Sequence, residues 1–336
     1  MRPLPAGTRY LAPRCVREAL SMKADHPRDG LFVAGGTDLY YNLKSGLGPT
    51  APVLIDLTRL PANDLRAVGW EGDGTLRVGA LATLAEVSGK EGLLRACFPA
   101  LAESAGLVGA PQHRQVGTIG GNLALDTRCH YYNQDPLWRE ALGGCLKAEG
   151  TVCHVTGSSS RCVARRAGDT VAPFLLYGAL VEYETLEGVG QMPIAGVFTG
   201  DGLFGPHLGL PDGAFIWGII LPSLKEGFRA SYEKIAPRRA FDFPQISLAV
   251  GGQFTPLGCE EVTIVVSSVR PKPRVMRFHV GGNLTLDRIA EIAHTVEAGV
   301  KPMTNIQGDP SFQSWRARVA GVHVARALTE LVRSDN

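Results

Sequence analysis

Four of the seven cysteines in this chain lie within one polar, glycine-rich segment, residues 126–165. Their spacing is C-x15-C-x7-C-x8-C, and they are Cys129, Cys145, Cys153 and Cys162. Arginines, a lysine, a histidine and glycines surround them, which is not the composition of an apolar core. Cysteine thiolates are the soft ligands that zinc and iron–sulfur clusters use in proteins. The residue types in this segment therefore predict a metal centre.

Packing, structural zinc and an iron–sulfur cluster are the three interpretations of the cysteines. Packing suits the three thiols outside the segment, because free cysteine buries readily beside apolar residues; these are Cys15, Cys97 and Cys259. Structural zinc usually binds paired C-x(2–4)-C knuckles, and the segment contains none. Widely spaced cysteines that converge in the fold suit a cluster, and nearby arginines and a lysine would offset its negative charge. Spacing alone leaves zinc and a cluster both open.

The composition is that of an ordinary globular protein with more than one core. The chain has 336 residues, of which 45% are hydrophobic and 20% charged, and its formal net charge is +2. This length predicts two or three domains. The mixed charges give no reason to expect nucleic acid or a membrane as partner, and no apolar run approaches the roughly 20 residues that span a bilayer. The N-terminus lacks the apolar stretch of a secretory signal, so we expect a cytoplasmic protein with reduced thiols.

Two paired-glycine motifs would offer backbone N–H groups to an anion. LFVAGGTD (31–38) predicts a strand, a glycine turn and a helix start, and VGTIGGNLALD (116–126) predicts a second turn of the same kind. Glycines let the backbone approach a ligand closely, and a helix N-terminus favours a diphosphate. The simpler interpretation of the first motif is a plain strand–turn–helix with Thr37 or Asp38 as the N-cap. Neither motif is the G-x-G-x-x-G of a Rossmann fold.

A later stretch, YEKIAPRRAFDFP (232–244), places a lysine and two arginines among aromatic residues. Lys234, Arg238 and Arg239 would suit an electron-rich ring or a phosphate. A solvated basic loop explains the same residues, and this motif alone does not separate the two interpretations.

Hydrophobic periodicity predicts the elements that must position these motifs. Strands are predicted at residues 31–34, 53–57, 76–83, 247–254 and 262–269. Helices are predicted at residues 16–22, 92–106, 286–296 and 311–333, and another apolar element is predicted at 171–186. The cysteine segment lies between well-patterned stretches, as an inserted loop would.

Taken in order, AGGTDL, TIGGN, GD-x-x-AP (168–173) and YEKIAPRRAFDFP resemble the motifs of FAD-binding subunits in the xanthine dehydrogenase family of molybdenum hydroxylases. The resemblance covers about residues 5–330. It implies an α+β fold with a two-part FAD-binding domain, at 1–60 and 61–228, and a C-terminal α+β domain at 229–336. Most members lack the cysteine segment, which here forms an insertion at about 126–167. That insertion resembles the one in the 4-hydroxybenzoyl-CoA reductase branch, whose β subunits bind an additional [4Fe–4S] cluster there.

The resemblance also implies which residues hold the cofactors. The backbone of residues 32–39 would wrap the FAD diphosphate, and residues 118–122 would form a second wall. The implied FAD-binding residues are Phe32, Val33, Ala34, Gly35, Gly36, Thr37, Asp38, Leu39, Val108, Thr118, Ile119, Gly120, Gly121, Asn122, Asp169, Ile216 and Lys234. The implied cluster ligands are Cys129, Cys145, Cys153 and Cys162. His130, directly after a cluster cysteine, is placed where it would touch both cofactors. The family often has an acid directly after the paired arginines, whereas here Ala240 and Phe241 precede Asp242.

The function implied is electron transfer within a molybdenum enzyme complex. A molybdopterin-containing large subunit would carry out the substrate chemistry, so no residue of this chain is expected to be catalytic. A small subunit with two [2Fe–2S] clusters and a ferredoxin-type donor are the other implied partners. The implied reaction is reductive dehydroxylation of 4-hydroxybenzoyl-CoA. The alternatives are the flavoprotein subunit of an oxidative hydroxylase, acting on xanthine, an aldehyde or an aromatic heterocycle, and a non-redox module with structural zinc.

Overall fold

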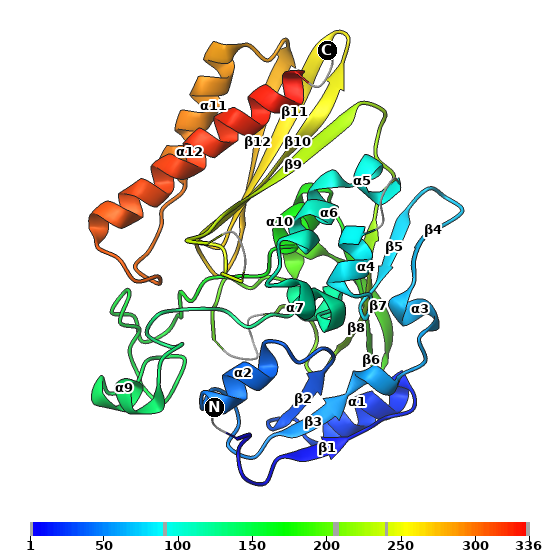
Figure 1. Ribbon diagram of the computed structural model, residues 1–336, viewed down its shortest axis with the longest axis vertical. Helices are drawn as coiled ribbons and strands as arrows, with labels where there is room; N and C mark the ends of the chain where they lie inside the picture. The colour runs from blue at the N-terminus through cyan, green and yellow to red at the C-terminus, as the bar shows by residue number, and fades with distance from the viewer. Residues whose placement is uncertain (1–2, 90–92, 204–207, 239–240, 334–336) are drawn as a thin grey trace.

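The computed structural model describes residues 3–89, 93–203, 208–238 and 241–333, which are arranged around three β-sheets (Figure 1). The N-terminal sheet has the strand order β1 (Arg9–Leu11), β3 (Val53–Asp56), β2 (Gly30–Val33), and its strands are parallel. Parallel neighbours require a crossover connection. Helix α1 (Val16–Asp25) provides one between β1 and β2, and α2 (Leu39–Lys44) follows β2.

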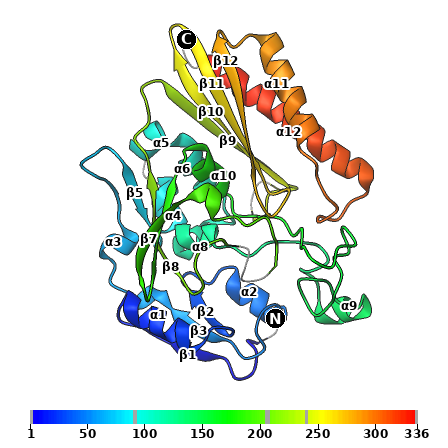
Figure 2. The same ribbon diagram turned by 180° about the vertical axis from the view of Figure 1, so that it is seen from behind.

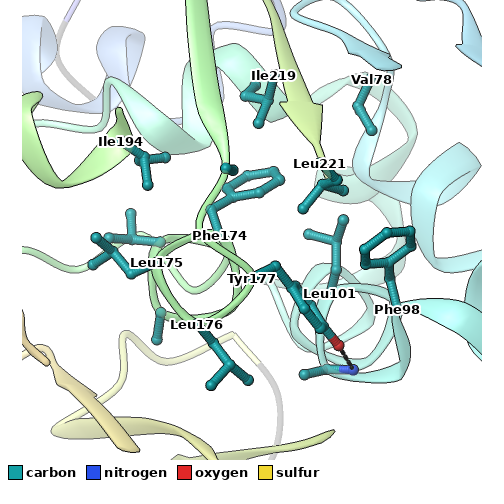
Figure 3. Packing of buried hydrophobic residues seen from close by; sticks show 14 of the residues in the cluster. Val78, Phe98, Leu101, Phe174, Leu175, Leu176, Tyr177, Ile194, Ile219 and Leu221 are labelled. Carbon is teal, nitrogen blue, oxygen red and sulfur yellow. Dashed lines mark hydrogen bonds between the residues drawn. The ribbon is translucent and has the colours of Figure 1, made fainter. Parts of the chain in front are cut away.

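The central sheet is five-stranded and antiparallel. Its order is β4 (Val68–Trp70), β5 (Leu76–Gly79), β8 (Phe215–Leu221), β6 (Leu180–Thr185), β7 (Gly188–Pro193). Helices α4 (Leu84–Gly89), α5 (Leu93–Cys97), α6 (Pro99–Gly106) and α10 (Val171–Leu176) belong to the same part of the chain. Figure 3 shows Phe174 and Tyr177 packed among strand and helix residues, with the Tyr177 hydroxyl accepting a hydrogen bond from the Ala100 N–H at 3.2 Å. Among the described residues this is the largest apolar core, and the second glycine motif packs against it.

The C-terminal sheet is an antiparallel meander in the order β12 (Arg274–Gly282), β11 (Gly258–Ser267), β10 (Ile246–Thr255), β9 (Phe228–Ile235). Helices α11 (Leu286–Gly299) and α12 (Pro310–Arg333) lie together along one face of it (Figures 1 and 2). Their apolar residues and the inner face of the sheet form a second core.

Most predicted strands and helices are confirmed, and three predictions are corrected. The strand predicted over 76–83 is β5, which ends at Gly79. The single helix predicted over 92–106 is two helices, α5 and α6, because Pro99 has no N–H to continue the first and instead occupies the first turn of the second. Residue 92 itself lies outside the described residues. The apolar element predicted at 171–186 is a helix followed by a strand, α10 and β6. None of the described helices combines the length and the apolar composition needed to cross a membrane.

Short helices complete the described chain: η1 (Leu57–Arg59), α3 (Asn63–Arg66), α7 (Pro111–Val116), α8 (Ile119–Leu123), α9 (Pro136–Ala141) and η2 (Ile194–Gly196). Of these, α9 is the helix of the cysteine segment, which otherwise consists of turns and irregular backbone. The segment projects as a lobe beside α2 and the loop that leads into α12 (Figures 1 and 2). We call residues 126–167 the cysteine lobe.

The two ends of the cysteine lobe are held side by side. Arg128 and Arg165 exchange both backbone hydrogen bonds, each at 2.8 Å, in an isolated antiparallel bridge. Buried Asn305, from the loop between α11 and α12, donates its side-chain N–H groups to the carbonyls of Val163 and Val269 at 2.8 and 2.9 Å. The lobe therefore has a closed neck, fastened to the C-terminal part of the chain.

Candidate cofactor sites

The first paired-glycine motif packs directly against the chain segment that precedes the second. A Cβ atom on Gly35 would lie 2.0 Å from the Val116 carbonyl oxygen, so no larger residue fits there. Gly36 has a φ of 65°, in the left-handed region that glycine adopts readily. A Cβ on Gly117 would in turn lie 3.6 Å from the Thr37 hydroxyl. Residues 32–39 and 118–122 therefore lie next to each other, although about 80 residues separate them in the sequence.

Asp38 stands at the N-terminus of α2 but does not cap it. Its side chain makes no hydrogen bond to the first turn, which corrects the simpler N-cap interpretation. The carboxylate instead forms an ion pair with the Arg128 guanidinium and accepts a hydrogen bond from the Asn42 amide at 2.9 Å. Arg128 also donates to the Asn42 side-chain oxygen at 2.8 Å. The first glycine motif is thus joined, through one side chain, to the residue that precedes Cys129.

The second motif is a helix start, and the prediction of a second turn like the first is wrong. Thr118 is the N-cap of α8, and its hydroxyl accepts a hydrogen bond from the Gly121 N–H at 3.1 Å. Glycine is needed at position 120 because a Cβ there would lie 2.9 Å from the Ala80 carbonyl oxygen. The Asn122 side-chain oxygen accepts hydrogen bonds from the Thr170 N–H and hydroxyl at 3.1 and 2.8 Å. This contact brings Asp169 to the second motif.

Asp169 and Lys234 form a buried ion pair with an oxygen–nitrogen distance of 3.0 Å. The Tyr232 hydroxyl donates to the same carboxylate oxygen at 3.0 Å, and Lys234 also donates to the Leu107 carbonyl at 2.8 Å, next to Val108. Burial raises the pKa of Asp169, and Lys234 acts in the opposite direction. Three residues that the sequence singled out separately, Val108, Asp169 and Lys234, are therefore neighbours.

Tyr232 is a site residue that the sequence interpretation missed. Burial and the Asp169 carboxylate raise its pKa well above the ordinary value, so the phenol stays protonated and donates. A signal was present, because Tyr232 precedes Lys234 by two positions on β9 and so lies on the same face of the strand.

Ile216 and His130 lie at the margins of this arrangement. Ile216, on β8, packs against the central core; the carbonyl of the next residue, Trp217, accepts a hydrogen bond from Ala80, which supports α8. The His130 ring packs edge-on against Tyr131 at 4.0 Å between centroids, and its backbone N–H donates to the Asn305 carbonyl at 3.0 Å. His130 is not among the residues that line the cysteine cavity, and its contact with two cofactors stays a prediction.

The stretch 232–244 contacts the cysteine lobe as well as Asp169. Arg238 is exposed and pairs with Asp242 at 2.7 Å, which gives that carboxylate a local partner and lowers its pKa. Arg239 lies outside the described residues. Further on, the Arg128 guanidinium stands 4.6 Å from the centre of the Phe243 ring, and the Pro244 carbonyl accepts a hydrogen bond from Arg165 at 2.6 Å. The loop therefore packs against both residues of the lobe's neck.

The four cysteines of the lobe line a single cavity. All four are buried, and the residues that line the cavity are Cys129, Tyr131, Tyr132, Cys145, Leu146, Lys147, Cys153, His154, Val155, Cys162 and Ala164. No Asp or Glu is among them. The convergence of four thiols that lie 33 positions apart from first to last is the observation on which the metal prediction depends.

Turns hold each cysteine in place. The backbone of Cys145 exchanges two hydrogen bonds with Ala148, both at 2.8 Å, and the carbonyl of Cys153 accepts from the Gly157 N–H at 2.7 Å. The N–H of Cys129 donates to the Asn133 side chain at 2.9 Å, and that of Cys162 donates to Asp201 at 3.1 Å. Cys129, Cys145 and Cys153 are thus held by local hydrogen bonds, whereas Cys162 is held by Asp201, outside the lobe.

The thiols differ in acidity. Burial raises the pKa of Cys129 to about 11 and that of Cys162 to about 12. Burial also raises the pKa of Cys153, but hydrogen bonds led by that of the Thr156 side chain outweigh it and lower the pKa below the ordinary value. A metal binds thiolates, so a cation entering this cavity would have to displace protons from the thiols of Cys129 and Cys162.

The other three cysteines lie away from the cavity. Cys97 packs against the central core and Cys259 is buried in the C-terminal core, which confirms the packing prediction for both. Cys15 is exposed at the N-terminus of α1, so the packing prediction was wrong for this residue. It occupies the N-cap position, where its side chain points away from any core.

Solved structures share this fold over almost the entire chain. A carbon monoxide dehydrogenase chain from Oligotropha carboxidovorans aligns with a TM-score of 0.75 at 22% identity, covering 97% of this chain and 98% of that one. The xanthine dehydrogenase FAD-binding subunit of Escherichia coli O157:H7 is 24% identical over 323 residues, 95% of this chain and 92% of the relative. The carbon monoxide dehydrogenase medium chain of Afipia carboxidovorans is 25% identical over 331 residues, 97% and 96% of the two chains.

The solved structures show a shared mixed α/β fold, and a family model defines the class as an FAD-binding oxidoreductase subunit. The family model for the FAD binding domain in molybdopterin dehydrogenase matches residues 6–224. The chain therefore belongs to that family, and the matched residues include both glycine motifs, Asp169 and the cysteine lobe.

Proposed function

We propose that this chain is an electron-transfer subunit that carries both FAD and a [4Fe–4S] cluster within a molybdenum enzyme complex. The cluster is proposed from one observation. Four thiols converge on a cavity without carboxylates, inside an insertion whose neck touches the first glycine motif. FAD binding follows from the family. When bound, the flavin exchanges one or two electrons and the cluster exchanges one, and the protein positions both and sets their potentials.

The donor set favours a cluster over a single zinc ion. Among residues 3–89, 93–203, 208–238 and 241–333, no three His, Cys, Asp or Glu side chains are gathered closely enough to hold one metal ion. Zinc needs its thiolates at roughly 2.3 Å from a single point. A four-iron cluster takes one cysteine on each iron and so accepts a wider ring of thiols. Four thiols that line one cavity without forming such a group support this choice.

On the flavin side, we propose that residues 32–39 and 118–122 hold the FAD diphosphate through their backbone. Gly35 leaves no room for a side chain against Val116, which keeps the two segments in contact, and Gly120 lets α8 lie against Ala80. Asp169, Lys234 and Val108 would then lie along the same ligand, with Tyr232 keeping the Asp169 carboxylate oriented by its 3.0 Å hydrogen bond. Ile216 would provide an apolar contact from β8.

The neck of the lobe supports short-range transfer between the two cofactors. Arg128 is adjacent to Cys129 in the chain and bonded to Asp38 in the first glycine motif. Its partner in the bridge, Arg165, lies four positions before Asp169. Both ends of the lobe are therefore anchored at residues that we assign to the flavin site.

We further propose the reaction and the partners. The partners are a molybdopterin-containing large subunit, a small subunit with two [2Fe–2S] clusters and a ferredoxin-type donor, in the cytoplasm. The reaction is the reductive dehydroxylation of 4-hydroxybenzoyl-CoA. The resemblance of the cysteine lobe to the insertion of the 4-hydroxybenzoyl-CoA reductase branch supports it. A second candidate is an oxidative hydroxylase, favoured by the full-length similarity to xanthine and carbon monoxide dehydrogenase subunits.

Metal and flavin analysis of the anaerobically purified chain tests the cofactor proposal. We expect about four irons, four acid-labile sulfides and one FAD per chain. One zinc with no iron would overturn the cluster, and a chain with no affinity for FAD would overturn the flavin assignment. An anaerobic assay of the complete complex then separates the two reactions: reduction of 4-hydroxybenzoyl-CoA supports the first, and oxidation of a purine, an aldehyde or carbon monoxide supports the second.

A further inference from the structure

Lys147 lines the cysteine cavity, and its side chain is completely buried. Its ammonium nitrogen lies 2.6 Å from an Asp126 carboxylate oxygen, 2.5 Å from the Thr127 hydroxyl and 3.1 Å from the Thr127 carbonyl. It also stands 4.4 Å from the centre of the Tyr132 ring, on which a cation is favoured. A buried lysine is rare and costly unless it is paired, so a cation in this position requires an explanation.

The hydrogen bonds fix the charge of Lys147. The Thr127 hydroxyl gives its own proton to the Gly202 carbonyl at 2.6 Å, so toward Lys147 it acts as an acceptor. A carboxylate oxygen and a carbonyl oxygen accept as well. Three acceptors require three N–H groups, which an ammonium has and a neutral amine lacks. Lys147 is therefore a fixed positive charge at the cavity wall.

One member of the ion pair between Lys147 and Asp126 lines the cavity and the other does not. Lys147 is one of the lining residues, whereas Asp126 is not. The carboxylate is turned toward Lys147 and toward the Thr127 N–H, which donates to it at 2.8 Å. Lys147 is therefore the member of the pair that borders the cavity with the four thiols. At low dielectric such an arrangement acts strongly on a nearby charge.

We propose that Lys147 is a positioning residue that raises the reduction potential of the cluster, and that Asp126 opposes it. The inference rests on the proposed function, because it needs the cluster in the cavity. Reduction adds one electron to an already anionic group surrounded by four thiolates. A buried ammonium stabilises that added charge more than solvent-exposed cations do, because water and salt screen the exposed ones.

The test is an anaerobic redox titration of the full chain, followed by the electron paramagnetic resonance of the reduced cluster. Lys147→Met should make the cluster at least tenfold harder to reduce, a drop of about 59 mV for a one-electron couple. Asp126→Asn, which removes the negative charge 2.6 Å from Lys147, should shift the potential upward. Lys147→Arg should restore most of the lost potential, and the double variant Lys147→Met/Asp126→Asn should lie between the two single ones.

The matched control is Arg161→Met. Arg161 is a cation of the same lobe and the direct neighbour of Cys162, but it is exposed. Its removal should move the potential much less than the removal of Lys147. Equal shifts from the two variants would overturn the inference, because burial would then not matter.

Shifts of the reduction potential in opposite directions for Lys147→Met and Asp126→Asn distinguish an electrostatic effect on the cluster from a purely structural role. A structural defect would shift both variants in the same direction or broaden the resonance without moving the potential, and either result overturns the inference. If Lys147→Met loses the cluster, the upward shift of Asp126→Asn decides the matter alone. A wild-type chain without iron would overturn the proposed function, whereas an iron-loaded wild type with unshifted variants would overturn only the role of Lys147.

Discussion

The part of residues 6–224 outside the cysteine lobe, which we call the FAD-binding frame, places its side chains and backbone differently from the lobe. In the frame, strands and an extensive apolar core bring backbone into contact, and Gly35 and Gly120 remove the side chains that would keep segments apart. In the lobe, one short helix and a set of turns hold four thiols around a cavity with a small apolar cluster. The comparison shows that a binding site can be built either by packing or by local hydrogen bonds and buried charge.

The difference predicts where each site is vulnerable. A site made by packing tolerates the loss of a distant polar group but not an added methyl at a contact. A site made by turns and charge tolerates changes in the core but not the loss of a ligand. The substitutions below test this contrast in order of expected effect.

The largest effect is expected for Cys145→Ser. Loss of one of four ligands should remove most of the iron while FAD stays bound, because the glycine motifs lie in the frame. Cys97→Ser is the matched control, since Cys97 packs against the central core and should leave both cofactors in place. Iron, sulfide and flavin analysis measure the outcome. Loss of iron in Cys97→Ser would show that the division of the cysteines is wrong.

Arg128→Met should have the next largest effect, because Arg128 connects the two regions. Burial lowers the pKa of its guanidinium to about 10, and its removal leaves the Asp38 carboxylate without this ion pair. Breaking a buried ion pair from one side typically costs about 3–5 kcal/mol. We expect that loss in the free energy of unfolding, measured with urea, together with weaker FAD binding. An unfolding free energy within about 1 kcal/mol of wild type would contradict the proposed link, since that is the range for surface pairs.

Gly35→Ala tests the frame alone. The added methyl would meet the Val116 carbonyl oxygen, and overpacking of this kind costs about 1–3 kcal/mol. We expect weaker FAD binding with unchanged iron content, measured by flavin titration and metal analysis. Gly69→Ala is the control, because no atom lies within 4 Å of a Cβ at that position. Equal FAD affinity in the two variants would refute a role for the close contact.

The smallest effect is expected for Arg238→Met, at an exposed ion pair. Asp242 has its pKa lowered by Arg238, so the pair stabilises the fold above the ordinary value of 3.8 and loses this contribution as pH falls through the folded-state pKa. Because the arginine is 70% exposed, the loss at neutral pH should not exceed about 1 kcal/mol. Urea unfolding at neutral and at strongly acid pH should show a small difference that disappears in acid.

Local patterns in the sequence were enough for most elements and for the grouping of the four cysteines. Strands such as β10 and the helix α12 follow from hydrophobic periodicity, and the composition of the lobe separated its thiols from those that pack. The contacts that join distant segments were not predictable in this way. The ion pair of Asp38 with Arg128 and the hydrogen bonds of Asn305 depend on tertiary arrangement, and no periodicity signals them.

Two predictions that the structure contradicts, for Cys15 and for TIGGN, also show how far composition alone predicts conformation. Cys15 lies beside apolar residues in the sequence, yet the start of α1 turns it to solvent. TIGGN has the composition of a turn, yet Thr118 caps a helix there, because Gly120 fits against Ala80. In the first case the local start of a helix, and in the second the fit of Gly120 against Ala80, decides a conformation that composition alone does not predict.

The bridge between Arg128 and Arg165 has a consequence for the architecture of the family. A segment whose ends meet as paired neighbours spans almost no distance, so its length can change without moving the elements on either side. The entropic cost of closing a longer loop grows only slowly with its length. The lobe is, in this sense, a separable module: its length could change at this point without moving the two glycine motifs.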